Sequence, residues 1–526
     1  MNKYYVGSTC LRYAVPFRYQ ETYEQACTNI EAMKEREQLL WMRRKCRSKE
    51  PESDIFDYIR NEIRYQEDDA SPYGNRIGTE WMHYASAEAD VGTSKPVRTF
   101  FYSPDGTPVH VSSNLWKLEV SNLGLDLFRN GVGVIWYEFK ISNHSKQIRM
   151  DSEWLKEFQN KIRELNRYDK LLWEITYEET PDLYSESHGY KKYAKPVLLG
   201  LWLDDILQNI QISHTYFAHR ICKGNSNRTV ADKAMLFSYV TFSETDNDQQ
   251  DAMAEREAIA YRLTNGYRDS YCFSKETAKE MRHPFDNVIW YATQEGAGYF
   301  AWPDASNQTT FDSDIRSKIC TDYFTLYLKV LHQSFSLLLY AEKIQMDLTE
   351  NEEDMNVLPE LCNEISFFLT KSMATTVSHI HNQSEFYIYL KERMRVHADV
   401  KSVTAGLNAL ENLQRERHRR EAEERSRQEW EEEKQRDQEE KQRDERLQIV
   451  LGFVSLLAVA SALVDAFDFI AKFANGADGG WTSILGHPVV MVVEVIFCML
   501  IVFVGIFAFR WTWKTYKDYH TSDRQL

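Results

Sequence analysis

The chain has 526 residues, 43% of them hydrophobic, which is enough for two or more structural parts with buried cores. The formal net charge is −16, from 63 Lys and Arg against 79 Asp and Glu, so the chain as a whole does not attract DNA or anionic lipid. We therefore expect no direct DNA binding. Eight cysteines occur without a C-x-x-C pair, which favours free thiols in a reducing compartment and gives no zinc site.

The N-terminal part, residues 1–312, is expected to be a cytosolic α/β domain. The opening residues lack the apolar core of a secretory signal, so we expect the N-terminus to stay in the cytoplasm. Strand signals are concentrated between residues 96 and 303, and the repeated tetrapeptide VIWY falls within them. The predicted strands and helices are a strand after Asn130-Gly131, strands at Met235–Phe242 and Asn287–Thr293, and helices at Ser152–Leu165, with Ser152 as N-cap, and Ala252–Leu263.

Helical patterns follow without interruption. Residues 313–383 are predicted to form a cytosolic helical layer, with helices at Asp314–Gln345 and Asp354–His379. The apolar stretch at 324–341 contains Lys329, His332 and Gln333, so we interpret it as a buried core helix rather than a membrane span.

Residues 384–446 are predicted to form one charged stalk helix. From Glu411 to Arg446 the chain has no Gly or Pro, and Glu precedes Arg by four residues at several places, as in Glu416 and Arg420. The pattern lacks the apolar seam of a leucine-type coiled coil. A solvated spacer or a disordered charged linker remains an alternative to a stalk that leads into the membrane.

Two segments, 447–473 and 487–510, are apolar enough to cross a bilayer, and we predict two transmembrane helices joined by an outer loop at 474–486. Lys and Arg precede the first segment and follow the second, in the basic tail at 511–526, whereas the loop has neither. The positive-inside rule then predicts a multi-pass protein of the inner (plasma) membrane with both termini cytoplasmic.

This order of parts resembles the CorA family of divalent-cation channels and transporters. The shared features are a cytosolic α/β domain, a helical layer, one long helix entering a first span, a short outer loop, a second span and a basic tail. The family's Gly-Met-Asn signature is absent, since the chain reads Phe473-Ala474-Asn475-Gly476, where only Asn475 offers a comparable amide. The resemblance implies a homopentamer with a pore lined by the first span and a divalent, Mg²⁺-like transported cation. A branch similar to CorA accompanies type III CRISPR systems as antiviral membrane effectors, which implies a nucleotide second messenger as gating ligand.

One stripe of the first span supplies the pore-lining candidates. At helical spacing it is apolar at the cytoplasmic end, small in the middle and charged at the outer end. The candidates are Leu447, Leu451, Val454, Ala458, Ser461, Asp465, Asp468 and Lys472, with Asn475 at the outer mouth. Five copies would stack acidic rings that concentrate cations, while the leucines and valine exclude water at the narrow end. Alternatively, the charged residues only mark the end of the span and are hydrated among lipid headgroups.

Glu494 is an intramembrane carboxylate of the second predicted span. An ionised carboxylate at that depth is costly unless it is partnered or faces water. We expect an interhelical partner, for which Ser461, Lys472 and His487 are candidates, or a protonated side chain packed against a neighbour.

No enzyme signature is found, so we expect no catalytic residue, and no cofactor or resident metal site can be assigned. The phosphate-loop, nucleophile-elbow and H-E-x-x-H patterns are all missing. Two other classes of function remain open. The hairpin could anchor a non-conducting sensor or scaffold, and a membrane-bound nucleotide hydrolase would need an acidic metal cluster that the sequence does not reveal.

Overall fold

The computed structural model describes residues 4–33, 41–44, 53–64, 76–83, 96–104, 114–143, 149–166, 172–180, 189–222, 228–244, 252–267, 273–350, 358–374, 376–475 and single residues between 492 and 514. The chain divides into two compact units, Met1–Arg415 and Glu416–Leu526. This division falls inside the predicted stalk, because residues that follow 396 still pack on the core of the first unit.

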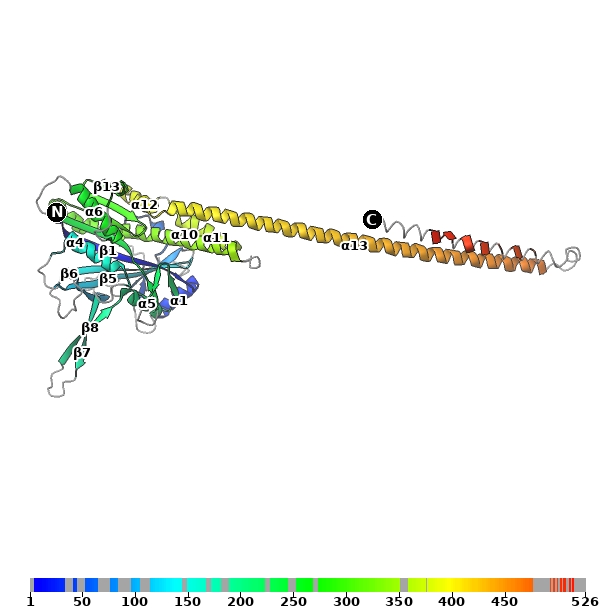
Figure 1. Cartoon of the computed structure of the whole chain (residues 1–526), viewed down its shortest axis with the longest axis horizontal. Coiled ribbons are helices and arrows are strands. Elements are labelled where there is room, and N and C mark those ends of the chain that lie inside the picture. The colour runs from blue at the N-terminus through cyan, green and yellow to red at the C-terminus, as the bar shows by residue number, and fades with distance from the viewer. Residues whose placement is uncertain are drawn as a thin grey trace. The chain divides into compact units, whose positions relative to one another are not determined.

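A large mixed sheet forms the centre of the first unit (Figure 1). Among the described residues, its strand order is β13-β14-β15-β12-β1-β6-β5-β4-β7-β8. In that order the strands are Arg282–Phe285, Val288–Thr293, Gly296–Ala301, Met235–Glu244, Tyr4–Tyr19, Val132–Asn143, Trp116–Phe128, Arg98–Tyr102, Leu172–Thr180 and Gly189–Val197. Three short strands pair off this path: β3 (Gly78–His83) with β5, β2 (Trp41–Arg43) with β3, and β9 (His214–Tyr216) with β1. β10 (His219–Ile221) pairs with β11 (Thr229–Ala231) in a separate ribbon.

The long strand β1 lies in the middle of the sheet and was not expected. It pairs antiparallel with β6 on one side and with β12 on the other, more than 200 residues away in the chain. Its side chains alternate between the two faces, as strand geometry requires: Tyr13 and Val15 join one core, and Cys10 and Ala14 join the other. A strand that is covered on both faces lacks the alternation of apolar and polar residues that identifies a half-exposed strand. The sequence of β1 therefore does not clearly predict a strand.

Helices cover both faces of the sheet. One core packs under α1 (Tyr23–Ala32), α4 (Ser152–Arg163), α5 (Leu199–Asn209) and α6 (Ala252–Asn265). The other packs under α10 (Phe324–Glu350), α11 (Leu358–Ser372), α12 (His381–Arg393) and the start of α13 (Val396–Asn475). Shorter elements are α2 (Asp57–Arg60), α7 (Lys275–Ala278), α8 (Gln308–Thr310), η3 (Phe311–Ile315), α9 (Arg316–Lys318) and η4 (Ile319–Tyr323), of which η3 and η4 are π-helical turns.

Most elements predicted inside this unit are confirmed. The strands near 132, 235 and 287 are β6, β12 and β14, and the helices near 152 and 252 are α4 and α6. The apolar stretch at 324–341 is the buried helix α10, and Lys329, His332 and Gln333 are all buried in it. The N-cap of α4 is Asp151 rather than Ser152, because the Asp151 side chain accepts a hydrogen bond from the backbone N–H of Trp154.

The helix expected to run unbroken from residue 384 is interrupted. α12 ends at Arg393, and Arg395 has a φ of 61°, outside the helical region, before α13 begins at Val396. The helix expected at Asp354–His379 is also shorter, since α11 spans Leu358–Ser372. A positive φ at arginine leaves no trace in the sequence, because the residues that usually signal it are glycine and asparagine.

The second unit consists of the remainder of α13 and helical residues beyond it. α13 continues through the predicted span 447–473 to Asn475 without interruption. Two transmembrane helices are not found: of 487–510, the structure describes only single residues from Val492 onward, which are helical and exposed. The larger part of the predicted outer loop, from residue 476 on, and Glu494 lie outside the described residues, as does most of the predicted tail.

Candidate functional site

The apolar segment of α13 is the strongest candidate for a functional surface. Within the described part of the chain, one helix is long and apolar enough to cross a membrane: it covers Val396–Ala466, and its most apolar 18-residue window has a mean hydropathy of 2.4 with none of it buried. Leu451 is 61% exposed and Phe453 is 68% exposed. Exposed apolar surfaces of this extent mark sites of interaction with other proteins or with membranes, so the segment is compatible with association with a membrane.

The predicted pore-lining residues lie where helical geometry places them. Leu447, Leu451, Val454, Ala458, Ser461 and Asp465 all belong to α13 at spacings of three or four residues and therefore share one stripe. All six are exposed in the single chain. The backbones of Asp468, Lys472 and Asn475 continue the helix, but their side chains lie outside the described residues, as does Glu494.

The described part of the chain shows no cluster of metal-ligating side chains. Across the described ranges, no group of three or more His, Cys, Asp or Glu side chains is placed to hold a metal ion. Asp465 is the single described carboxylate of the stripe, and eighteen residues of helix, or roughly 27 Å, separate it from Leu447. A ring of carboxylates at this level would require several copies around an axis.

The base of α13 is anchored in the first unit. Val396, Val403, Leu407 and Leu410 are buried in the core that also contains α10 and α12. Gly406 allows the two helices to approach closely, because a Cβ at this position would lie 3.0 Å from Ile344 Cγ2 of α10. A displacement of α10 would therefore directly move the start of α13, the helix that carries the apolar segment.

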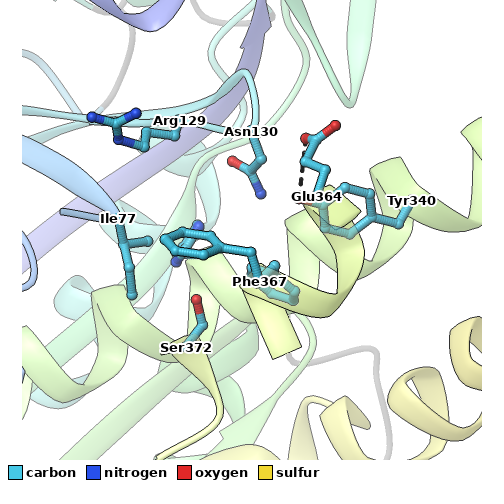
Figure 2. A pocket seen from close by; sticks show the side chains of 9 residues that line it. Ile77, Arg129, Asn130, Tyr340, Glu364, Phe367 and Ser372 are labelled. Atoms are coloured by element: carbon cyan, nitrogen blue, oxygen red, sulfur yellow. Dashed lines mark hydrogen bonds between the residues drawn. The ribbon is translucent and has the colours of Figure 1, made fainter. Parts of the chain in front are cut away.

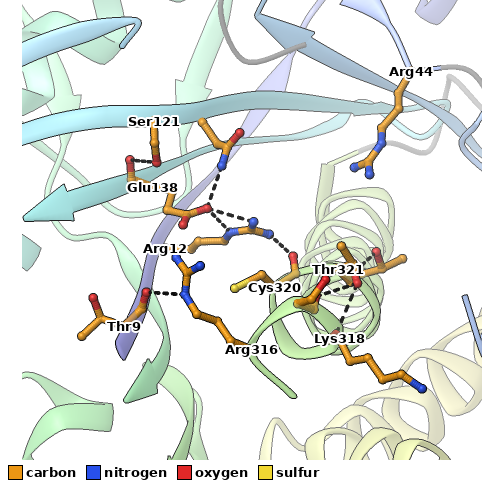
Figure 3. A network of polar contacts seen from close by, with 12 residues as sticks. Thr9, Arg12, Arg44, Ser121, Glu138, Arg316, Lys318, Cys320 and Thr321 are labelled. Carbon is orange, nitrogen blue, oxygen red and sulfur yellow. Dashed lines mark hydrogen bonds and ion pairs between the residues drawn. The ribbon is translucent and has the colours of Figure 1, made fainter. Parts of the chain in front are cut away.

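Buried polar contacts tie the sheet to the helices that lead to α10 (Figure 3). Arg12 of β1 donates from Nε to Glu138 of the neighbouring strand β6 at 2.9 Å, and its Nη1 donates to the carbonyl of Cys320 in η4. The guanidinium also lies over the ring of Phe324, 4.3 Å from its centroid. Burial alone would raise the pKa of Glu138, but the charge of Arg12 and the hydrogen bonds to the carboxylate outweigh it, so the pKa is lowered and Glu138 is ionised.

A second contact in Figure 3 strengthens this connection: Arg316 of α9 donates from Nε to the carbonyl of Thr9 in β1 at 3.1 Å. Sequence reasoning missed these residues. Single charged residues inside strand patterns are normally interpreted as belonging to a solvent face, and nothing in the sequence says that two of them meet 126 residues apart. The network holds the π-helical turns against the sheet, so sheet and helices form a continuous packed body.

The five cysteines that the structure describes, Cys10, Cys27, Cys222, Cys320 and Cys362, form no disulfide.

The chain matches no protein-family model, no curated protein and no solved structure.

Proposed function

We propose that the chain is an oligomeric ion channel or transporter of the CorA-like type, in which the N-terminal unit senses a signal and gates a pore lined by α13. The observation that carries the proposal is the continuity of α13. One helix begins in the core of the first unit at Val396 and continues into an exposed apolar segment that carries Asp465 on a stripe of small and aliphatic residues. Such a helix contains a segment suited to a membrane and connects that segment covalently to the sensing unit.

The chemistry of the stripe supports cation conduction. Five copies would place five Asp465 carboxylates in one ring, where fixed negative charge raises the local concentration of cations. Leu447, Leu451 and Val454 would form the narrow, water-excluding end of the same pathway. A divalent cation is the transported ion to which the resemblance points.

The resemblance also supports a biological setting. In that setting the protein is an antiviral membrane effector, located in the inner membrane with both termini cytoplasmic, and a nucleotide second messenger released by a type III CRISPR system opens the pore. The lipid bilayer and further copies of the chain are its structural partners.

A membrane-anchored sensor or scaffold that does not conduct is the second candidate. Lys472 favours it, because a lysine four residues after Asp468 on a helix is placed to neutralise that carboxylate and weaken an acidic ring. The two functions differ in one measurable property, the flux of cations.

Flux through liposomes tests the proposal. The double variant Asp465→Asn, Asp468→Asn removes two negative charges per chain while keeping side-chain size, and cation flux is expected to fall about ten-fold or more because the local cation concentration falls. The matched control is Asp437→Asn, Asp444→Asn, which removes the same charge from the exposed charged part of α13. Equal flux in the two double variants would show that Asp465 and Asp468 only mark the end of the span, whereas absence of flux from the wild-type chain would leave the anchored sensor as the better account.

A further inference from the structure

A cavity of about 330 Å³ lies in the first unit between the β5–β6 turn and the helices α10 and α11 (Figure 2). Figure 2 shows Ile77 and Arg129 on one side of it, Tyr340 and Glu364 on the other, and Asn130 between them. Gly131, with a φ of +85°, closes the turn that presents Asn130. The volume is within the range of natural small-molecule sites, roughly 300–1,000 Å³.

The walls of the cavity are aromatic and held in place by their own contacts. The ring of His332 stacks on Phe128 with a centroid separation of 3.6 Å, and Phe368 packs edge-on against the same imidazole at 5.5 Å. Asn130 Nδ2 donates to Ser336 Oγ at 2.6 Å, and the Tyr340 hydroxyl donates to Glu364 at 3.1 Å. The site is therefore formed before any ligand arrives.

Two residues that line this cavity each carry a buried polar atom without a hydrogen-bond partner among the described residues. His332 is 3% exposed and Ser372 is 1% exposed, and neither His332 Nε2 nor Ser372 Oγ makes a hydrogen bond to any residue that the structure describes. Ser372 is nevertheless fixed, because its carbonyl accepts a hydrogen bond from Gln333 Nε2 at 2.6 Å. Unsatisfied buried polar groups are rare in folded proteins and call for an explanation.

The two polar atoms are uncharged. Burial, reinforced by the charge of Lys329, lowers the pKa of His332 well below its ordinary value, so the imidazole is neutral. The charged residues along the described lining, Arg129 and Glu364, have opposite signs and are partly exposed, so they do not select an ionic ligand for the buried end.

We propose that this cavity binds a small, uncharged, planar heteroaromatic molecule, whose ring packs among Ile77, Phe367 and Phe368 and whose polar edge bonds to His332 Nε2 and Ser372 Oγ. A neutral imidazole and a hydroxyl can each donate or accept, so they match an edge that carries both a donor and an acceptor. Phe367 is 41% exposed and provides the aromatic surface at the open side.

Binding at this site would act on α10, and α10 contacts α13 through Ile344 and Gly406. A regulatory effect on conduction rests on the proposed function, whereas the binding site itself does not. The two claims are separated by measuring binding directly, without flux.

The test uses the full chain in lipid nanodiscs at pH 8 and two ring systems of the same shape. Benzimidazole carries one N–H donor and one nitrogen acceptor and is uncharged at this pH, whereas indene is its hydrocarbon counterpart. Calorimetry is expected to give saturable binding of one benzimidazole per chain, about five- to ten-fold tighter than indene, because the polar edge makes hydrogen bonds that indene lacks.

Three variants identify the site. Ser372→Ala and His332→Phe each remove one unpaired atom, and His332→Phe keeps the stacked ring. Both are expected to weaken benzimidazole binding by about five-fold. Ser372→Ala should not lower the melting temperature, because the Oγ that it removes makes no hydrogen bond to a described residue. His332→Phe also removes Nδ1, so its binding is compared with the wild type at a temperature where both proteins are folded. Ser366→Ala, an exposed serine of the same helix α11, is the matched control and should bind as the wild type does.

The proposal is overturned by any of three results: no saturable binding of benzimidazole, equal affinity for indene, or unchanged affinity in both cavity variants. The last two would mean that only water satisfies the polar atoms. Loss of flux in the aspartate variants with normal benzimidazole binding supports both proposals, and binding without any wild-type flux supports this one alone.

Discussion

Two facing carboxyl groups in the sheet have opposite ionisation behaviour. Glu80 of β3 and Asp126 of β5 are register partners and are both buried. Glu80 accepts hydrogen bonds from Arg44 at 2.8 Å and Arg64 at 2.9 Å. Neither oxygen of Asp126 makes a hydrogen bond of good geometry among the described residues.

The pKa values of the two groups follow from these surroundings. Burial alone would raise the pKa of Glu80, but the charges and hydrogen bonds of Arg44 and Arg64 outweigh it and lower the pKa to about 2. Burial, reinforced by the charge of Glu80, raises the pKa of Asp126 well above its ordinary value. Glu80 is thus ionised at neutral pH, whereas Asp126 retains its proton to higher pH than an exposed aspartate.

Substitution of each carboxyl group by its amide should have opposite consequences. Glu80→Gln removes the carboxylate charge that pairs with buried Arg64 and is expected to cost about 3–5 kcal/mol of unfolding free energy. Asp126→Asn resembles the protonated acid and is expected to be neutral or stabilising. Differential scanning fluorimetry in detergent provides the comparison, and equal loss of stability in the two variants would refute this assignment.

The pH dependence has a definite sign for each group. Because the folded-state pKa of Glu80 lies below its unfolded value of about 4.3, its stabilisation is complete above that value and is lost as pH falls towards 2. Asp126 acts in the other direction: the folded chain keeps a proton that the unfolded chain releases above about 3.9, so stability falls as pH rises. The advantage of Asp126→Asn over the wild type should therefore grow as pH rises from 5.

Such residues show the limit of sequence reasoning at this scale. Glu80, Asp126 and Arg12 are polar positions in strands, and composition alone assigns them to a solvent face. Their burial depends on the helices and strands that cover them, which are distant in the chain. The unpaired His332 and Ser372 are similarly hidden, since a histidine in an apolar helix indicates a core position without saying that a cavity lies beside it.

At the scale of elements, the junction between α12 and α13 stores strain in one residue. Arg395 has a φ of 61°, a conformation that costs a non-glycine residue roughly 1 kcal/mol or more. Its carbonyl accepts hydrogen bonds from the N–H groups of Ala398 and Asp399, so this conformation is built into the start of α13.

Glycine at this junction should stabilise the protein. Arg395→Gly removes the steric cost and is expected to raise the unfolding free energy by about 0.5–1 kcal/mol, whereas Arg395→Val should lower it by more than that. Lys401→Gly is the control, because the same residue placed at an exposed position inside α13 should cost about 1 kcal/mol. Thermal melts of the three variants measure these changes in stability. A destabilised Arg395→Gly would show that contacts of the arginine side chain contribute more to stability than relief of the backbone conformation does.

The stalk illustrates what the sequence predicts well. The absence of Gly and Pro and the Glu-to-Arg spacing predicted helix, and α13 is helical throughout that stretch, with ion pairs such as Glu416 to Arg420 at 2.7 Å. Local patterns determine such an element. The break at Arg395 and the strand β1 could not be derived in the same way, because a tertiary environment imposes them.

At the scale of the whole chain, mixed α/β structure with a long apolar helix towards the C-terminus was predictable, and the strand order was not. The pairing of β1 with β12 joins segments more than 200 residues apart. In the sequence, the alternation of both strands' side chains between two cores is the only feature related to this pairing, and it does not identify the partner strand. The shared stripe of Leu447, Leu451, Val454, Ala458, Ser461 and Asp465 was predictable, because these residues lie on one helix. The cavity was not, since its walls come from the β5–β6 turn, α10, α11 and the residue before β3.

Assembly is the property of the whole molecule that the proposed function requires. In a single chain, the described side chains of the apolar segment of α13 are exposed, except for half-buried Leu463, and Asp465 faces no described partner. A carboxylate near the hydrocarbon boundary gains water or a partner when several copies of the helix surround a common axis. The charged part of α13 between 416 and 446 has no apolar seam, so the contacts between copies must come from the apolar segment and the first unit.

Mass photometry of the full chain in mild detergent measures this assembly. We expect one species of about five times the 62.0 kDa chain mass, the number to which the resemblance points. The variant Asp465→Asn, Asp468→Asn should give the same species, because an uncharged amide is no more costly than a carboxylate near a membrane boundary. Loss of flux in that variant can then be attributed to charge rather than to dissociation. A monodisperse monomer or dimer of the wild-type chain would exclude a pore lined by α13, and with it the proposed conduction.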